Sequence, residues 1–395
     1  MSLPQIVIKP AKEKSILRKH PWVFSGAIKS INGAVENGDL VEVVANKGRH
    51  LGYGHYQNGS IAVRLLLFED EQLSDNLFHE RIERAYLLRS SLNFSQEKQT
   101  NIYRLVHAEG DFLPGLIIDH YAGHLVIQCH SIGMYRAIEQ IKEALLKVYG
   151  NDLKSIYLKS ASTLPRDYND YKGDGCIYGE NDKAVMAIEN NHSFVIDWIN
   201  GQKTGFFIDQ RDNRALLGRY SSGKKVLNTF CYSGGFSVYA LSAGASLVHS
   251  VDSSQTAIAL TDENVGIGKY DPEKHHSYCA DVMDFMKELK EDYDVIILDP
   301  PAFAKHQNAK HNAVQGYKRL NALAISQIKS GGIIFTFSCS QVVDKILFNN
   351  TVIAAAITTG RKVRILHQLH QPADHPISAT HPEGEYLKGL VIQVE

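Results

Sequence analysis

The feature that most constrains the fold is the regular alternation of short apolar strands with helical stretches beyond about residue 190. Parallel strands need helical crossovers, so this rhythm predicts a doubly wound α/β sheet covered by helices on both faces. Two further strand-like segments, 362–371 and 386–394, are expected to form an antiparallel pair at one edge. The predicted parallel strands are Val226–Phe230, Leu247–Asp252, His276–Asp281, Val295–Asp299 and Ile333–Ser338.

Open α/β sheets bind ligands at the carboxyl ends of their strands, and the first predicted strand is followed there by a glycine pair. The stretch Phe230-Cys-Tyr-Ser-Gly-Gly235 lets the backbone approach a ligand closely before the next helix begins. It lacks the G-x-G-x-x-G spacing, which argues against a pyrophosphate-binding dinucleotide loop and therefore against a dehydrogenase.

Three acidic residues end the next three predicted strands. Asp252 lies about 18 residues after Gly234, where a carboxylate accepts hydrogen bonds from ribose hydroxyls, and Asp281 is placed to meet an adenine edge. Asp299 ends the fourth strand. Any one of them also fits a helix N-cap, but three at successive strand ends indicate a nucleoside-containing ligand.

Together, the glycine loop, the three acids and Asp299-Pro-Pro resemble the motifs of class I S-adenosylmethionine-dependent methyltransferases, which implies a Rossmann-like domain and that cofactor. The segment 203–211 resembles the one preceding this domain in RNA-modifying members, although Phe206-Phe207 also fits core packing. The resemblance implies a cofactor site formed by Phe207, Asp209, Gln210, Phe230, Tyr232, Ser233, Gly234, Gly235, Asp252, Asp281, Asp299 and Pro300.

A cysteine follows the last predicted parallel strand. Cys339 lies in Phe-Ser-Cys-Ser, about forty residues after Asp299-Pro300-Pro301. C5 of a pyrimidine is a poor nucleophile, and a thiolate that adds to C6 activates it by covalent catalysis. The two prolines form a rigid turn without amide hydrogens, so Asp299 and nearby carbonyls are free to contact the base. Alone, Cys339 would fit a packed hydrophobe; with Asp299 upstream, both are predicted to be catalytic.

The remaining cysteine pattern argues against other chemistry. The five cysteines lie about 45 to 60 residues apart without a C-x-x-C pair, which disfavours a disulfide framework and a zinc site. His275-His276 has no partner at ligand spacing, so we expect no metal.

Upstream of the sheet, two segments differ in character. Residues 1–72 contain short strands separated by glycine and asparagine turns, which predicts a small β-barrel binding module. Residues 73–190 mix a helix at 76–92 and another at 134–148 with strands, which predicts an α+β middle domain; residues 191–395 form the catalytic domain.

Most of the chain resembles the RlmI-type 23S ribosomal RNA 5-methylcytosine methyltransferases, and 1–72 is similar to their PUA RNA-binding domain. The matching stretches are His20–Ser25, Asp299–Phe303, Gly316–Lys318, Thr336–Ser340, Ala373–Pro376 and Pro382–Gly389. Other 5-methylcytosine enzymes carry a second cysteine in the proline loop, and its absence here leaves the base that removes the C5 proton open among Asp299, His375 and Glu383.

The resemblance implies methyl transfer to C5 of a cytosine in 23S ribosomal RNA. The net charge of −1 is unusual for an RNA-binding protein, but local cations can supply phosphate contacts, and Lys9, Lys12, Arg18 and Lys19 are the candidates for that role. On charge alone, the same residues fit a solvated N-terminal face equally well. No apolar run is long enough to span a bilayer and no signal peptide is evident, so a cytoplasmic monomer or homodimer is expected. Three alternatives remain: a 5-methyluridine enzyme, a base-nitrogen methyltransferase, and a non-catalytic RNA-binding assembly factor.

Overall fold

The computed structural model describes residues 3–94, 99–180, 184–289, 291–304 and 306–395. The chain folds as two compact units, each assembled from separated segments. The first contains Met1–Ala187, Ile196–Phe206 and Ala373–Gly384, and the second contains Ile188–Val195, Phe207–Pro372 and Glu385–Glu395. No helix among the described ranges is long and apolar enough to cross a membrane.

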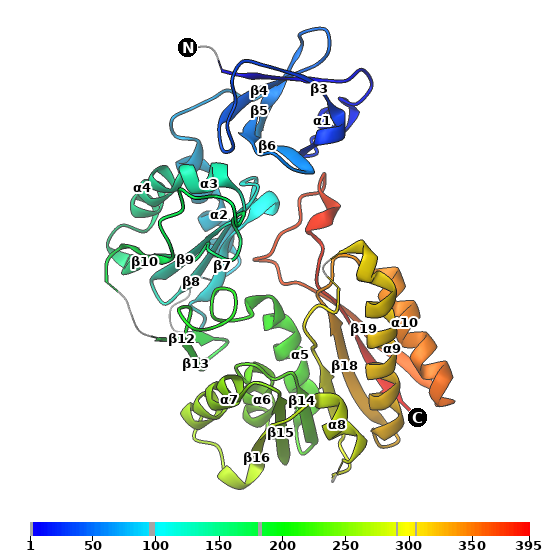
Figure 1. The fold of residues 1–395 in the computed structure, drawn as a ribbon. Helices are drawn as coiled ribbons and strands as arrows, with labels where there is room; N and C mark the ends of the chain where they lie inside the picture. The colour runs from blue at the N-terminus through cyan, green and yellow to red at the C-terminus, as the bar shows by residue number, and fades with distance from the viewer. Residues whose placement is uncertain (1–2, 95–98, 181–183, 290, 305) are drawn as a thin grey trace. The chain divides into compact units, whose positions relative to one another are not determined.

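The N-terminal part of the first unit is a six-stranded sheet in the order β2-β6-β5-β4-β1-β3, with the short helix α1 (Lys14–Leu17) (Figure 1). The apolar alternation in this part of the sequence predicts strands at Gln5–Lys9, Leu40–Val44, Gly52–Tyr56 and Ile61–Phe68; all four are present as β1, β4, β5 and β6, and β2 and β3 are additional. Buried residues of β1, β2, β4, β5 and β6, such as Ile6 and Ile8 of β1, fill a shared apolar core, whereas β3 is mostly exposed. The strands are β1 (Gln5–Ile8), β2 (Trp22–Phe24), β3 (Ile28–Asn32), β4 (Leu40–Val44), β5 (His50–Tyr56) and β6 (Ile61–Phe68).

A second sheet in the same unit has the order β11-β10-β9-β8-β7, with α2 (Leu77–Ser91) and α4 (Ile138–Tyr149) packed side by side (Figure 1). The helix predicted at 134–148 is two helices, because the chain bends at Ala137 after α3 (Ile132–Arg136). The Ser131 side chain accepts from the Met134 amide and starts α3 early. The strands are β7 (Ile102–His107), β8 (Leu116–Tyr121), β9 (His124–Cys129), β10 (Ser155–Leu158) and β11 (Gly175–Tyr178), followed by the hairpin β12 (Val185–Glu189) and β13 (His192–Ile196).

The second unit contains the predicted α/β sheet, in the order β16-β15-β14-β17-β18-β20-β19. Its first five strands are parallel, and the predicted antiparallel pair at the edge is confirmed. The strands are β14 (Lys225–Thr229), β15 (Leu247–Asp252), β16 (His275–Cys279), β17 (Val295–Leu298), β18 (Gly332–Ser338), β19 (Val363–His370) and β20 (Lys388–Val394).

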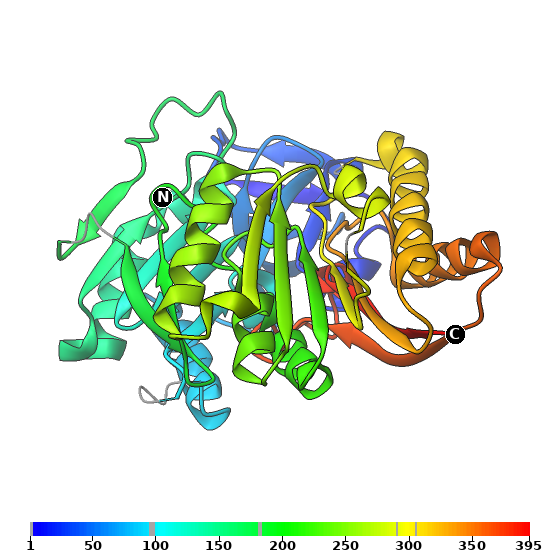
Figure 2. The same cartoon turned by 90° about the horizontal axis from the view of Figure 1, so that it is seen from below.

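Helices cover both faces of this sheet, as expected for a doubly wound fold (Figure 2). Ile334 of β18 belongs to the apolar core shared with α8, α9 and α10. Its neighbours Phe335 and Phe337 point to the opposite face, where their rings contact Tyr220 of α5 and Phe236 of α6 at centroid distances of 5.7 Å. The helices are α5 (Arg211–Ser221), α6 (Gly235–Ser242), α7 (Gln255–Ile267), α8 (Val282–Lys287), α9 (Lys310–Gln327) and α10 (Lys345–Thr359).

Candidate active site

The loop after β14 has an unusual backbone. Phe230, Tyr232 and Gly234 have φ angles of 56°, 48° and 72°, in the left-handed region that bulky side chains rarely adopt. At Gly234 a Cβ would lie 2.8 Å from the Thr261 methyl group, so only glycine fits. Strained backbone of this kind persists where surrounding contacts enforce it, and it is concentrated at ligand sites.

Those enforcing contacts come from α7 and β15. The Thr261 hydroxyl donates to the Tyr232 carbonyl at 2.9 Å, and the Asn264 amide donates to the Ser233 carbonyl at 2.8 Å. The Tyr232 amide donates to Asp252 Oδ2 at 3.1 Å. The loop from Phe230 to Gly235 is therefore held open at the carboxyl end of β14, as a preformed cradle.

The predicted acids occupy different local roles. Asp252 is the last residue of β15 and is only partly buried, so its oxygens retain room for a further donor beyond the loop amides. Asp281 is exposed and caps α8, accepting from the Asp284 amide at 3.1 Å. The N-cap interpretation thus holds for Asp281, whose carboxylate nevertheless lies after β16, at the carboxyl edge shared with Asp252.

The segment before α5 supplies a second group of polar atoms. Asp209 Oδ2 accepts from the Tyr386 hydroxyl at 2.6 Å, whereas its Oδ1 is buried without a hydrogen-bond partner in the described part of the chain. The Phe207 ring lies 5.1 Å from the Tyr232 ring in an edge-on contact, which joins this segment to the glycine loop. A buried, unpaired carboxylate oxygen is costly unless a donor arrives with a ligand.

Asp299 directly follows β17 and is oriented by a short relay of amides. Gln210 Nε2 donates to Asp299 Oδ2 at 3.0 Å, and Asn213 Nδ2 donates to Gln210 Oε1 at 2.7 Å. Burial raises the pKa of Asp299 to about 7; the charge of Asp209 acts in the same direction and the Gln210 hydrogen bond opposes it. The carboxyl group is therefore partly protonated at neutral pH, while Pro300 beside it is buried and has no amide hydrogen.

Cys339 directly follows β18, the parallel neighbour of β17. Both strands end at the same edge of the sheet. The loop that follows β18 and carries Cys339 (the cysteine loop) therefore lies beside the loop that follows β17 and carries Pro300-Pro301 (the proline loop). The Ser340 hydroxyl joins the two loops by donating to the Ala304 carbonyl at 2.7 Å. Cys339 is partly exposed between two buried serines. By contrast, burial raises the pKa of both Cys129 and Cys231 to about 12.

Three side chains near this edge were not predicted individually. Tyr317 of α9 is buried with its ring 4.6 Å from Phe303 of the proline loop, and burial raises its pKa to about 12. Tyr386 contacts Asp209, and Lys388 of β20 contacts the cysteine loop. All three lie within sequence stretches that match the family motifs, and those stretches were the available signal.

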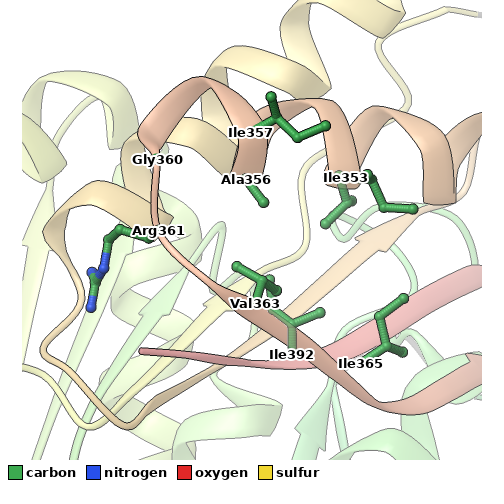
Figure 3. A pocket seen from close by; sticks show the side chains of 9 residues that line it. Ile353, Ala356, Ile357, Gly360, Arg361, Val363, Ile365 and Ile392 are labelled. Carbon is green, nitrogen blue, oxygen red and sulfur yellow. The ribbon is translucent and has the colours of Figure 1, made fainter.

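A separate apolar groove of about 540 Å³ lies between α10 and β19, lined by Ile353, Ile357 and Ile365 among others, with the Arg361 guanidinium directed away from its apolar side chains (Figure 3). It contains none of the predicted site residues.

The predicted RNA-binding cations lie in the first unit, around α1. Lys9, Lys12 and Arg18 are exposed, and Lys9 Nζ donates to the Gly26 carbonyl at 2.9 Å. Lys19 forms an ion pair with Asp70, which neutralises part of the expected charge. All four cationic groups thus lie at the surface, and Lys9, Lys12 and Arg18 form no ion pair among the described residues.

The two other predicted bases also belong to the first unit. His375 is buried, with Nδ1 3.0 Å from Asp374. Glu383, His20 and His381 place one potential ligand atom each within 4.8 Å of one another. The Trp22 amide donates to His20 Nδ1 at 3.2 Å. A neutral His20 ring therefore carries its proton on Nε2, which faces Glu383. A metal ion held by this cluster would have to displace that proton.

The sheet order, the strained glycine loop and the acids at successive strand ends define a class I S-adenosylmethionine-dependent methyltransferase. The site fits the cofactor, since the orphaned Asp209 Oδ1 can accept from its ammonium group and Asp252 from its ribose. Family models agree: residues 6–68 match a PUA-like domain, and 161–381 match an S-adenosylmethionine-dependent methyltransferase.

Curated relatives identify the family more closely. The chain is 40% identical to the ribosomal RNA large subunit methyltransferase I of Tolumonas auensis over 98% of each sequence, and 39% identical to that of Shewanella denitrificans over 99% of each. The chain belongs to this methyltransferase I family.

Solved structures support the same fold over the full length. A methyltransferase from Streptococcus mutans superimposes with a TM-score of 0.84 at 23% identity, and a methyltransferase bound to S-adenosylhomocysteine superimposes with a TM-score of 0.86 at 24% identity. Each comparison covers 100% of both chains.

Proposed function

We propose that this chain transfers a methyl group from S-adenosylmethionine to C5 of a cytosine in 23S ribosomal RNA, through a covalent bond between Cys339 and C6. The observation that carries the proposal is the placement of Cys339 and Asp299 at the ends of adjacent strands, with their loops joined by the Ser340 hydroxyl. The names of the relatives support ribosomal RNA of the large subunit as the substrate. Action on that RNA would place the protein in the cytoplasm.

The cofactor would lie along the glycine loop, with Phe207 and Asp209 at one end and Asp252 at the other. Gln210 holds Asp299 in place from the same segment. When bound, S-adenosylmethionine supplies an electrophilic methyl group on a sulfonium. The remaining steps belong to the protein and the base.

In the first step the Cys339 thiolate forms a bond to C6 and the C5=C6 double bond opens, which makes C5 nucleophilic. A protonated Asp299 donates to N3 of cytosine and neutralises the charge that builds on the ring. After methylation the Asp299 carboxylate, which has given its proton to N3, takes the C5 proton; the C5=C6 bond reforms as the Cys339–C6 bond breaks and the thiolate leaves, and N3 releases its proton to solvent. Of the three predicted bases for that proton, only Asp299 belongs to this unit.

The partly protonated state of Asp299 favours cytosine over uracil. N3 of cytosine is an acceptor and can receive the carboxylic acid proton, whereas N3 of uracil carries its own hydrogen. A 5-methyluridine enzyme would be better served by an ionised carboxylate at this position. The PUA-like module and its exposed cations would hold the RNA, and the target base must leave its stack to reach the edge of the sheet.

The test is methylation of unmodified 23S and 16S rRNA with labelled S-adenosylmethionine, followed by identification of the nucleoside by mass spectrometry. We expect 5-methylcytidine in 23S rRNA only. The Cys339→Ala variant should bind the cofactor normally and form no product, whereas the exposed control Cys279→Ala should keep full activity. A methylated purine, or product from Cys339→Ala, would overturn the covalent mechanism. Cofactor binding without any product would favour an RNA-binding assembly factor.

A further inference from the structure

A buried lysine lies directly beside the loop that carries Cys339. Lys388 is only 5% exposed, which is rare for an ammonium group. It is the first residue of β20 and pairs with Ser338, the residue before Cys339, in the antiparallel register. Its Nζ donates to the Ser340 carbonyl at 2.6 Å and to the Val343 carbonyl at 2.7 Å.

These contacts leave the charge of Lys388 without a close counterion. Among the described residues its hydrogen-bond acceptors are the two carbonyls, and the carboxylates of Glu385 and Asp344 act on it through their charge without forming an ion pair with it. Burial lowers the pKa of Lys388 to about 8, while the charges of Cys339, Glu385 and Asp344 oppose that fall. At pH 7 roughly nine-tenths of the lysine is still protonated.

A buried cation that lacks a paired carboxylate is expensive unless an anion forms nearby. An ionised Cys339 would act on Lys388 more strongly than the carboxylates of Glu385 and Asp344 do. Two further titratable groups lie on neighbouring elements. Burial keeps Tyr317 of α9 neutral at physiological pH, and Asp299, which follows β17, is only partly ionised there because burial raises its pKa to about 7.

We propose that Lys388 is the positioning residue that holds Cys339 as a thiolate, the form able to attack C6. The thiol proton passes to solvent and the Lys388 ammonium compensates the charge left on Sγ; nothing is oxidised or reduced. This inference rests on the proposed nucleophilic role of Cys339. By tying Ser340 and Val343 to β20, the same side chain also fixes the loop in place.

Lys388 could thus stabilise the thiolate by its charge or only fix the loop, and the pH at which the Cys339 thiolate forms distinguishes these two contributions. In a Cys176→Ser, Cys279→Ser background, the remaining accessible thiol is Cys339, because Cys129 and Cys231 are buried. The rate of iodoacetamide alkylation is followed from pH 5 to 10, with S-adenosylmethionine affinity and circular dichroism as checks on folding. A thiolate is the reactive species, so the midpoint of the rate reports its formation.

Lys388→Met should raise that midpoint by at least one pH unit, which slows alkylation about tenfold at pH 7. Lys388→Arg keeps a charge and should retain a midpoint near that of the parent. The matched control Lys345→Met removes an exposed lysine from the start of α10, close to the same loop, and should leave the midpoint unchanged. If Lys388→Met fails to fold, Lys388→Gln, which can still donate to the carbonyls, takes its place.

An unchanged alkylation midpoint in a folded Lys388→Met or Lys388→Gln protein would overturn the inference, because it would show that Lys388 only holds the loop in place. The result is distinguishable from failure of the proposed function. Product formation by Cys339→Ala would refute the role of Cys339 as the nucleophile, whatever the alkylation data show. If the alkylation midpoint nevertheless shifted in Lys388→Met, Lys388 would still stabilise the Cys339 thiolate, but that thiolate would have no catalytic role.

Discussion

If Asp299 acts as the acid that protonates N3, its removal must change the pH dependence of catalysis in a defined way. Replacing it by asparagine keeps the shape and the Gln210 contact but removes the titrating proton. With a pKa of about 7, Asp299 is roughly nine-tenths protonated at pH 6 and roughly one-tenth protonated at pH 8. The acid contribution should therefore be almost complete at pH 6 and fall about tenfold for each pH unit above 7.

General acids of this kind typically accelerate a reaction by about 10² to 10⁴. We expect single-turnover methylation by Asp299→Asn to be about 100-fold slower than wild type at pH 6, with the ratio of the two rates shrinking about tenfold per unit above pH 7. Using the ratio matters, because the Cys339 thiolate becomes more abundant with pH in both proteins and its effect cancels.

The assay is rapid-quench transfer of labelled methyl groups to an RNA fragment under enzyme excess, from pH 6 to 9. The exposed Asp292→Asn is the matched control and should give a ratio near one throughout. A large Asp299→Asn defect that stays constant across this range would refute the acid role and leave Asp299 as a hydrogen-bonding or cofactor-positioning residue.

Three further predictions follow from buried charges. Asp209→Asn removes the orphaned carboxylate oxygen and should weaken S-adenosylmethionine binding about 10- to 100-fold by calorimetry, since charge-assisted bonds contribute roughly 1.5 to 3 kcal/mol. Glu189→Gln breaks a fully buried pair in which Arg214 Nε and Nη2 donate at 2.8 and 2.7 Å, and should lower the unfolding free energy of the catalytic unit by about 3 to 5 kcal/mol in urea. The pKa of Asp299 is higher in the folded than in the unfolded protein, so the folded state binds more protons between pH 4 and 7 and its stability falls as pH rises through that range. At pH 8 the buried carboxylate is ionised and destabilises the fold, whereas at pH 4 it is protonated. Asp299→Asn should therefore raise the Tm of the cofactor-free protein at pH 8 but not at pH 4.

Much of the catalytic sheet could be predicted from the sequence because its strands are short, apolar and separated by helical periodicity. Leu247–Asp252 is predicted to the residue, and the others to within one or two. The missed strands β2 and β3 are short or exposed, with burial too irregular to show a period of two. The domain limits at residues 72 and 190 remain predictions; the compact units instead interleave residues 196–206 and 373–384 with the N-terminal part.

The site was harder to predict where roles depend on contacts between distant residues. Motifs place Asp209, Gln210 and Asp299 in the sequence, but only the folded chain shows Gln210 bridging to Asp299 across 89 positions. The partial protonation of Asp299 likewise depends on burial and on the charge of Asp209, neither of which a strand-end aspartate reveals. The sequence also gives no sign that Lys19 is neutralised by Asp70.

The topology explains why two unpredicted residues reach the active edge. Parallel strands bring their carboxyl ends to that edge, and sequence reasoning searched there for site residues. An antiparallel strand in the same sheet brings its amino end instead. Because β20 runs against β18, with Lys388 opposite Ser338, the residues that begin β20 must lie beside Cys339. The direction of β20 therefore places Tyr386 next to Asp209 and Lys388 next to the loop that carries Cys339. In such a sheet, site residues can therefore be found in the segment that leads into the antiparallel strand as well as in the loops that follow the parallel strands.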